Sequence, residues 1–246
     1  MSQVFISDLH LDESRPETSA QFYALLRTQC QGIEALYILG DLYEAWIGDD
    51  DDSELAQNTQ NALAECKASG THIFVQRGNR DFLLSTQFAE RVGAQLLPDY
   101  AVITCAGEPA LLMHGDLLCT DDSAYQQFRM QSRKPAWQQH LLSQSLAARR
   151  VFAEHARQTS QARQTELKDA HQLESITDVN QQAVLDTMQH FGVRRLIHGH
   201  THRPARHALN IQGQAAERIV LGDWYEQASS LLVSGNQITL SFAQAQ

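Results

Sequence analysis

The sequence VFISDLHL (residues 4–11) decides the fold, because a short apolar run ends abruptly in an aspartate and a histidine. Such runs recur along the chain, and Gly, Asp or Asn bounds most of them, which predicts buried β-strands that end in polar turns. The runs are VFIS (4–7), ALYIL (35–39), HIFVQ (72–76), ALLMH (110–114), RLIH (195–198), RIVLG (218–222), SSLLVS (229–234) and QITLSF (237–242).

Helical patterns near residues 18–31, 54–68 and 85–92 separate the early strands, an alternation that is typical of α/β proteins. The final strands follow one another without helices and predict antiparallel pairs. We therefore expect two packed sheets flanked by helices.

Residues 121–170 break this rhythm and have almost no strand signal. Apolar residues recur there at mostly four- to five-residue steps, which predicts helices with one apolar face. We interpret residues 1–120 and 171–246 as the core and residues 121–170 as a helical insertion, or cap. The apolar positions are Trp137, Leu141, Leu142, Leu146, Val151 and Phe152.

The composition excludes several classes of protein. The chain has 246 residues and a net charge of −10, which argues against a chain-wide surface for nucleic acid. No apolar run approaches the roughly 20 residues that span a bilayer, and MSQVFISDLHL (1–11) is no secretory signal, so we expect a cytoplasmic location. Four widely spaced cysteines predict reduced, buried thiols.

The charge is unevenly distributed. Residues 125–163 contain seven Lys or Arg and one Glu, which gives +6 and leaves −16 for the remainder. We expect these basic side chains to face outward, toward anionic lipid. The acidic run at residues 49–52 is interpreted as a solvated turn.

Polar clusters follow five of the predicted strands, and strand ends are where α/β folds form their ligand crevice. Asp-x-His directs two ligands toward one ion, because residues two apart share a face. His200 and His202 have the same spacing and would offer one imidazole to each of two ions, with Asp41 as the natural bridge. A mixed nitrogen and oxygen set suits Mn²⁺, Fe²⁺ or Zn²⁺. The clusters are Asp8-Leu9-His10, Gly40-Asp41, Gly78-Asn79-Arg80-Asp81, His114-Gly115-Asp116 and His198-Gly199-His200-Thr201-His202.

These motifs, in this order, resemble the calcineurin-like metallophosphoesterase superfamily. The resemblance implies an α/β fold, a four-layer αββα sandwich, with a dimetal centre. One metal would be held by Asp8, His10, Asp41 and His202, and the second by Asp41, Asn79, His114 and His200.

Longer blocks resemble the UDP-2,3-diacylglucosamine diphosphatase family over nearly the whole chain. They are YILGDLYEAWIGDDD (37–51), QRGNRDFLL (76–84), LLMHGDLLCTDDSAYQQFR (111–129), LIHGHTHRPA (196–205) and VLGDWYE (220–226). The resemblance implies two Mn²⁺ ions and hydrolysis of UDP-2,3-diacylglucosamine to UMP and 2,3-diacylglucosamine 1-phosphate (lipid X) in lipid A biosynthesis. It also implies a peripheral protein at the cytoplasmic face of the inner membrane, and we expect a monomer.

Arg80 stands where many superfamily members have a histidine. A guanidinium cannot act as a general acid, but it can grip phosphate oxygens in a bidentate manner. We expect a hydroxide between the metals to attack the uridylyl phosphorus, with Arg80, Asn79 and His200 stabilising the developing charge. The catalytic set is then Asp41, Asn79, Arg80, His114 and His200. His198, Asp116 and Asp81 are expected to orient metal ligands.

The cap is expected to bind the two acyl chains and to add substrate contacts. The resemblance implies contacts from Asp122 and Tyr125, while Arg157 is either a contact or a plain surface arginine. In TSQARQTELKDAHQ (159–172) the spacing departs from the family, so several positions stay open. Thr165 and Lys168 keep a polar-x-x-Lys step, the preceding serine position is Ser160 or Gln161, and Gln164 is a further candidate.

Three alternatives remain at this stage. A metallophosphoesterase of another substrate class, such as a nucleotide-sugar hydrolase or a cyclic-nucleotide phosphodiesterase, would need no apolar cap. A degenerate scaffold that only binds partners would have lost ligands, yet all seven ligand positions are present. A nuclease would need a basic track, which the acidic core lacks, and aromatics for base stacking, of which the insertion has one Trp and few others.

Overall fold

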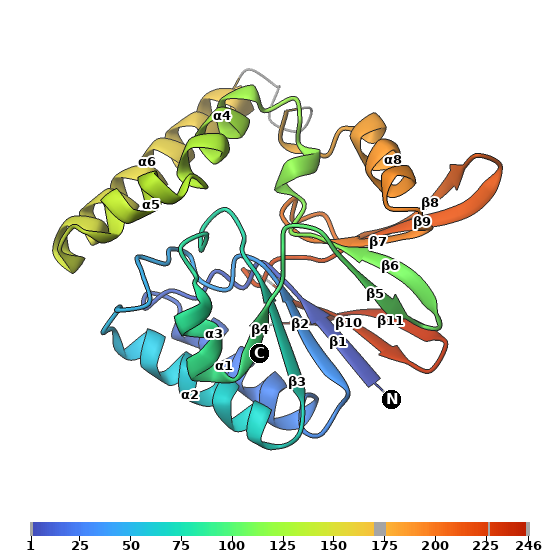
Figure 1. Cartoon of the computed structure of the whole chain (residues 1–246), viewed down its shortest axis with the longest axis horizontal. Coiled ribbons are helices and arrows are strands. Elements are labelled where there is room, and N and C mark those ends of the chain that lie inside the picture. Colours follow the sequence, from blue (N-terminus) through green and yellow to red (C-terminus); the bar gives the residue numbers. More distant parts are fainter. Residues whose placement is uncertain (1, 170–175, 226, 245–246) are drawn as a thin grey trace.

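A computed structural model describes residues 2–169, 176–225 and 227–244 (Figure 1). Two β-sheets form its centre. The first has six strands in the order β11-β10-β1-β2-β3-β4, and the second has five in the order β5-β6-β7-β9-β8. Both sheets mix parallel and antiparallel pairs.

The first sheet starts from β1 (Ser2–Ile6), to which β2 (Ala35–Leu39), β3 (His72–Gln76) and β4 (Ala94–Leu96) add in parallel. On the other side of β1, β10 (Gln227–Ser234) and β11 (Gln237–Gln244) add as antiparallel strands. Helices α1 (Pro16–Thr28), α2 (Glu54–Ala68) and α3 (Thr86–Val92) connect the parallel strands.

The second sheet contains β5 (Ala101–Cys105), β6 (Glu108–Leu112), β7 (Arg195–His198), β8 (Ala205–Ile211) and β9 (Gln214–Val220). A short 3₁₀ helix η1 (Asp116–Leu118) follows β6, and α8 (Gln181–His190) precedes β7. Asn180 caps α8 by accepting from the backbone N–H groups of Gln182 and Ala183.

Alternation along the strands produces the layers. In β1, Val4 and Ile6 pack toward α1–α3, whereas Phe5 faces the second sheet and stacks on Tyr37. The second sheet packs its other face against α8 through Leu196 and neighbouring apolar residues. The predicted αββα sandwich is thus confirmed.

The strand predictions hold for β2, β3 and β7, whose bounds agree with the sequence pattern, and nearly hold for β1, β6 and β9–β11. Four elements, β4, β5, β8 and α8, were not predicted from the sequence. β4 has only three residues, and β8 alternates half-buried with exposed positions, so neither has a continuous apolar run.

Three helices lie within the predicted insertion: α4 (Ser123–Ser132), α5 (Pro135–Leu142) and α6 (Leu146–Asp169). Figure 1 shows them side by side, beyond the loops at one end of the sheets. Trp137 and Leu141, two of the apolar positions of the predicted helices, join the core of the first sheet. Val151 does not, since it is 70% exposed.

All four cysteines are buried and free, which confirms the thiol prediction. Among the described helices, none combines the length and apolar character needed to cross a membrane.

Candidate metal centre and adjoining pocket

The candidate ligands gather where the two sheets present their strand ends. Asp8 and His10 follow β1, Asp41 follows β2, and Asn79 follows β3 in the first sheet. The remaining ligands, His114, His200 and His202, follow the neighbouring strands β6 and β7 of the second.

The backbone is strained at this point. Seven described residues other than glycine have positive φ, and five of them are candidate ligands. A left-handed conformation at a non-glycine residue costs energy and persists where the surrounding structure enforces it, most often at functional sites. These five residues are Asp8, His10, Asp41, His200 and His202.

Asp8, His10 and His202 form the first ligand group. The Nε2 atoms of the two histidines are 3.2 Å apart. Oδ1 of Asp8 lies 3.4 Å from His202 Nε2 and 3.9 Å from His10 Nε2. Three donor atoms therefore converge on one point.

Asp41 lies between this group and a second one. Its Oδ2 atom is 3.7 Å from His10 Nε2 and also 3.7 Å from His114 Nε2. Asn79 Oδ1 joins the second side, at 2.9 Å from His114 Nε2 and 2.8 Å from His200 Nδ1. The position of Asp41 is the one that the sequence predicted for a bridging ligand.

The donor set fits two divalent cations. Oδ1 of Asp8 is buried and has no hydrogen-bond partner, which is costly for a carboxylate unless a cation compensates it. Asp8 also belongs to the second ligand group, with Asp41 and His114, whereas the sequence assigned it to one metal. Imidazole nitrogens with carboxylate and amide oxygens suit Mn²⁺, Fe²⁺ or Zn²⁺.

Two glycines permit this approach of the loops. A Cβ atom at Gly78 would overlap Asp41 Oδ1, and one at Gly199 would overlap Asp8 Oδ2. The glycines of the Gly-Asn and Gly-His motifs therefore keep space for the carboxylates rather than provide flexibility.

Three of the ligand histidines are oriented through their other nitrogen. His10 Nδ1 lies 3.0 Å from Glu44 Oε2, His202 Nδ1 lies 3.1 Å from Asp223 Oδ2, and His114 Nδ1 lies 2.9 Å from the carbonyl of Leu39. Burial alone would lower the pKa of His202, but Asp223 and Asp8 outweigh it and raise that pKa to about 10. Glu44 and Asp223 were not predicted from the sequence, since neither stands in a ligand motif.

Asp81, Asp116 and His198, which the sequence predicted to orient metal ligands, hydrogen-bond the surrounding loops and α4. Asp81 accepts from the backbone N–H groups of Gly78 and Leu42 at 2.7 Å, and so joins two ligand loops. Asp116 accepts from Tyr125 Oη at 2.5 Å and from Arg129 Nε at 2.7 Å, and so connects the centre to α4. His198 turns Nδ1 to the Gly199 carbonyl. Burial, and then Arg218, lower its pKa to about 3.

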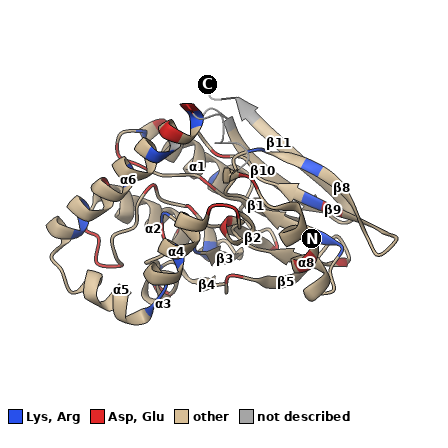
Figure 2. Cartoon of the chain, turned by 90° about the horizontal axis from the view of Figure 1, so that it is seen from above, with Lys and Arg blue, Asp and Glu red and all other residues tan. Residues whose placement is uncertain are grey.

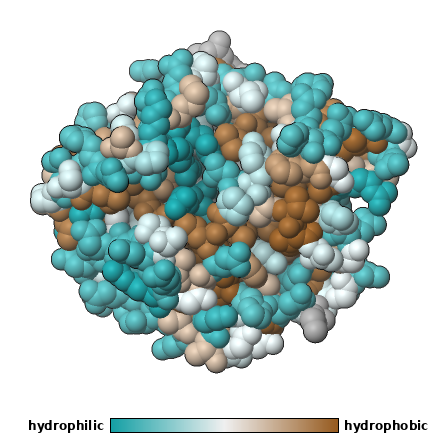
Figure 3. Space-filling view, viewed as in Figure 1, coloured by the Kyte–Doolittle hydropathy of each residue, from teal (hydrophilic) through white to brown (hydrophobic). Residues whose placement is uncertain are grey.

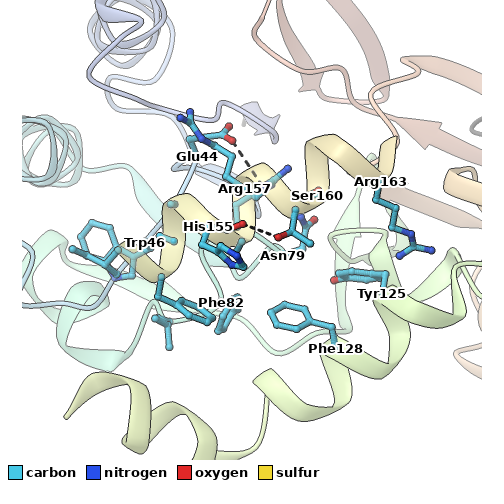
Figure 4. A pocket seen from close by; sticks show the side chains of 18 of the residues that line it. Glu44, Trp46, Asn79, Phe82, Tyr125, Phe128, His155, Arg157, Ser160 and Arg163 are labelled. Carbon is cyan, nitrogen blue, oxygen red and sulfur yellow. Dashed lines mark hydrogen bonds and ion pairs between the residues drawn. The ribbon is translucent and has the colours of Figure 1, made fainter. Parts of the chain in front are cut away.

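A pocket of about 470 Å³ opens beside the centre, between α4–α6 and the loops after β2 and β3 (Figure 4). Asn79 and Arg80 line it next to the ligands, and most of the remaining wall is apolar. Figure 3 shows hydrophobic side chains gathered in the hollow beneath the cap helices. The apolar wall includes Trp46, Ile47, Phe82, Leu83, Phe128 and Phe152.

The structure brings Arg80 and four further predicted contacts into this pocket: Asp122, Tyr125, Arg157 and Ser160. Tyr125 also faces His200, with 6.0 Å between the ring centroids.

Two predicted contacts lie on α6 but do not line the pocket. Thr165 donates its hydroxyl to the Gln161 carbonyl of its own helix, and Lys168 is exposed. The side chain of Gln164 lies outside the described residues. These three contacts stay predictions.

Sequence reasoning missed Arg163, which lines the pocket and pairs with Asp122 at 2.7 Å. It also gave no role to Trp46, although Trp46 belongs to a quoted block. Helical spacing could have predicted Arg163 as a pocket residue, because Ser160 and Arg163 are three residues apart and share a face of the helix.

The expectation that the basic residues of the cap face outward is wrong for Arg149, which is buried, whereas Lys134 and Arg150 are exposed. Arg149 contacts Asp50 at 2.5 Å, and Arg150 contacts Asp52 at 2.6 Å. Figure 2 shows basic positions of α6, in blue, on the same side of the molecule as an acidic loop, in red. The acidic run is therefore no plain solvated turn, because it neutralises part of the cap.

Comparisons with known proteins agree with this geometry. A model of the calcineurin-like phosphoesterase family matches residues 1–204. The chain is 56% identical to "UDP-2,3-diacylglucosamine hydrolase" of Stenotrophomonas maltophilia (strain R551-3) and 53% identical to the protein of that name from Xanthomonas campestris pv. campestris (strain 8004). Each alignment spans 242 residues and covers 98% of both chains.

A solved structure described as a novel archaeal phosphodiesterase covers 98% of this chain and 99% of its own, with a TM-score of 0.47 and 11% identity. That likeness is too distant to bear on function. The family model and the relatives are decisive: the chain is a hydrolase with a site for two divalent metal ions, and it belongs to the UDP-2,3-diacylglucosamine hydrolase family of calcineurin-like phosphoesterases.

Proposed function

We propose that the chain hydrolyses the diphosphate of UDP-2,3-diacylglucosamine to UMP and lipid X in lipid A biosynthesis, with two Mn²⁺ ions as cofactor. The names of the relatives support the substrate. The observation that carries the proposal is the apolar pocket, which opens directly on Asn79 and Arg80 beside the ligand groups.

The pocket matches the two halves of the leaving product. Its polar end would hold the phosphate and glucosamine, near Asn79, Arg80 and Tyr125. Its apolar end would hold acyl chain, where each buried methylene group contributes about 0.8 kcal/mol. A nucleotide-sugar hydrolase whose substrate has no acyl chains would not need an apolar pocket wall.

The positions of this chain's side chains suggest their roles. Arg80 donates its backbone N–H to Asp41 Oδ1 at 2.8 Å, which fixes its Cα near the bridge, and Arg80 also lines the pocket. It would grip phosphate oxygens there. Arg157 lines the same wall and would contact the phosphate or the sugar. Bound divalent ions would neutralise phosphate charge and make a hydroxide available near neutral pH.

In the reaction, a water oxygen would bond to the uridylyl phosphorus while the bond from that phosphorus to the bridging oxygen breaks. The bridging oxygen leaves with lipid X. Since a phosphate is a better leaving group than an alkoxide, charge stabilisation by Arg80 and Asn79 matters more than proton donation. Hydrolysis in ¹⁸O water should place the label in UMP, and label in lipid X would refute this assignment.

The substrate is tested by comparing UDP-2,3-diacylglucosamine with UDP-N-acetylglucosamine, using metal-free protein reconstituted in turn with Mn²⁺, Mg²⁺, Zn²⁺ and Fe²⁺. We expect a much higher kcat/KM for the diacylated substrate and the highest activity with Mn²⁺. Equal kcat/KM for both substrates would contradict the proposal that the apolar pocket binds acyl chains.

We also propose that the protein is a monomer that binds peripherally to the cytoplasmic face of the inner membrane. Support comes from exposed apolar side chains on the cap rather than from its charge: Met130 is 63% exposed and Val151 70%. Flotation with vesicles of inner-membrane lipid tests this. The double variant Met130→Ser/Val151→Ser should float less than the wild type, and equal flotation would contradict the cap surface. Sedimentation equilibrium tests the monomer.

A further inference from the structure

One ion pair joins the cap to the core at the apolar end of the pocket. The guanidinium of Arg149, near the start of α6, contacts both carboxylate oxygens of Asp50, at 2.7 Å and 2.5 Å. Its Nη1 atom also donates to the carbonyl of Ile47 at 2.6 Å, and its Nε atom donates to the carbonyl of Gln144 at 3.1 Å. This arrangement is a bidentate pair with two further hydrogen bonds, which is stronger and more directional than an ordinary surface contact.

Arg149 is 3% exposed, so its charge is almost out of water although it stands near an apolar wall. A buried guanidinium is tolerated only when it is paired and its donors are satisfied. The carboxylate of Asp50 and the two carbonyls meet this requirement. Arg149 can then line the pocket with its stem while its charged head is held in the loop.

Gly48 makes this contact sterically feasible. A Cβ atom at Gly48 would overlap Arg149 Nη1, and φ at Gly48 is +135°, which an L-residue rarely adopts. The loop at residues 46–50 therefore has a conformation built to receive the guanidinium.

The same loop supplies the pocket wall. Trp46 and Ile47 line the pocket, and Trp46 Nε1 donates to Asp49 at 2.9 Å. Asp49 in turn accepts from the backbone N–H of Phe88 at 2.9 Å, which anchors the loop to α3. In Figure 4, Trp46 lies at the end of the pocket opposite Tyr125 and Arg163. Arg149 thus fixes α6 to the wall that lies far from the phosphate end.

We propose that Arg149 and Asp50 are positioning residues that fix the far end of the acyl pocket and thereby set the acyl-chain length that the protein prefers. The inference rests on the proposed function. The pair touches no reacting group. It acts by holding α6 at one distance from Trp46 and Ile47. It also keeps the guanidinium of Arg149 paired, so that no unpaired charge faces the end of the acyl chain.

The test uses the full-length protein with Mn²⁺ and a series of UDP-2,3-diacylglucosamines whose chains differ by two methylene groups. Asp50→Asn keeps the shape of the side chain and removes its charge. Arg149→Lys keeps the charge and removes the planar guanidinium that contacts both carboxylate oxygens. For the preferred length, both variants should raise KM about tenfold, with kcat changed less than about twofold. Both should also flatten the length preference, while Asp50→Glu should restore it in part.

Two controls separate positioning from general damage. Hydrolysis of bis(p-nitrophenyl) phosphate, which has no acyl chain, should stay within about twofold of the wild type in every variant. Arg150→Gln removes the neighbouring exposed pairs of α6 with Asp51 and Asp52, and it should leave KM and the length preference unchanged.

An unchanged length profile in folded Asp50→Asn protein would overturn the proposal, as would an equal loss of activity on both kinds of substrate. Failure of the wild type to hydrolyse any diacylated substrate would instead overturn the proposed function.

Discussion

The ligand loops and the cap are held in place by different kinds of interaction. Around the metal centre, each ligand follows a strand end, five of the seven have strained backbone, and two glycines leave no space for a Cβ beside Asp41 and Asp8. The cap is joined to the core by apolar packing of Trp137 and Leu141 and by ion pairs between residues about 100 positions apart, such as Arg149 with Asp50. The centre is thus built for one fixed geometry, whereas the position of the cap depends on a few contacts that a single substitution can remove.

The largest loss of activity should come from substitution of Asp41, the residue between the two ligand groups. In Asp41→Asn the side chain keeps its size but loses the charge shared between the two ligand groups, so we expect kcat/KM to fall at least about a hundredfold. Metal content by mass spectrometry should drop below two ions per chain, while circular dichroism stays as in the wild type. Full activity with two bound ions would show that Asp41 does not bridge.

The second prediction sharpens the claim that the loops tolerate no displacement. Gly199→Ala places a methyl group on Asp8 Oδ2, and a ligand shift of about 1 Å typically costs about a hundredfold in rate. We expect a loss of tenfold to a hundredfold, with weaker metal binding. Gly235→Ala is the control, because its Cβ would meet open space. That variant should change stability but not metal content, and equal losses in both variants would contradict the steric argument.

The contrast between the two regions also explains what the sequence could predict. Asp8, His10 and Asp41 each follow an apolar run directly, so the local pattern located them at one edge of the sheet. The partner of Arg149 has no such signal, since ion pairing across the fold leaves no period in the sequence. For the same reason the interpretation of residues 49–52 as a plain solvated turn overlooked the buried Asp49 and the ion pairs of Asp50 and Asp52 with the cap, although these two side chains are mostly exposed. Asp223 was likewise missed as the partner of His202.

The third prediction concerns the pocket wall of the cap. Phe152 lines the pocket and contacts Trp137, with ring centroids 5.8 Å apart, yet its side chain is 37% exposed. Phe152→Ala should therefore raise KM for the diacylated substrate about three- to tenfold with little loss of stability. Gln158→Ala, an exposed position on the same helix, is the control. Steady-state kinetics in mixed micelles measures both, and an equal KM in the two variants would argue against acyl chains at this wall.

The smallest effect should be the pH dependence of the cap contact. The hydrogen bonds from Arg149 lower the pKa of Asp50, and the positive charge of Arg91 acts in the same direction. Asp51 and Arg150 lie beside the pair. Because the folded-state pKa is below the unfolded value of about 3.9, the stability from this pair is present above that value. It is lost as the pH falls through the lowered pKa.

Since the Asp50 side chain is 60% exposed, this contribution should be under about 1 kcal/mol, or at most about 3 °C in Tm. The Tm difference between wild type and Asp50→Asn should therefore be positive at pH 7 and vanish in acid. A difference that stays constant from pH 7 to pH 2 would mean that the charge of Asp50 does not stabilise the contact. The cap would then be held by apolar packing, and the comparison with the metal centre would lose its electrostatic basis.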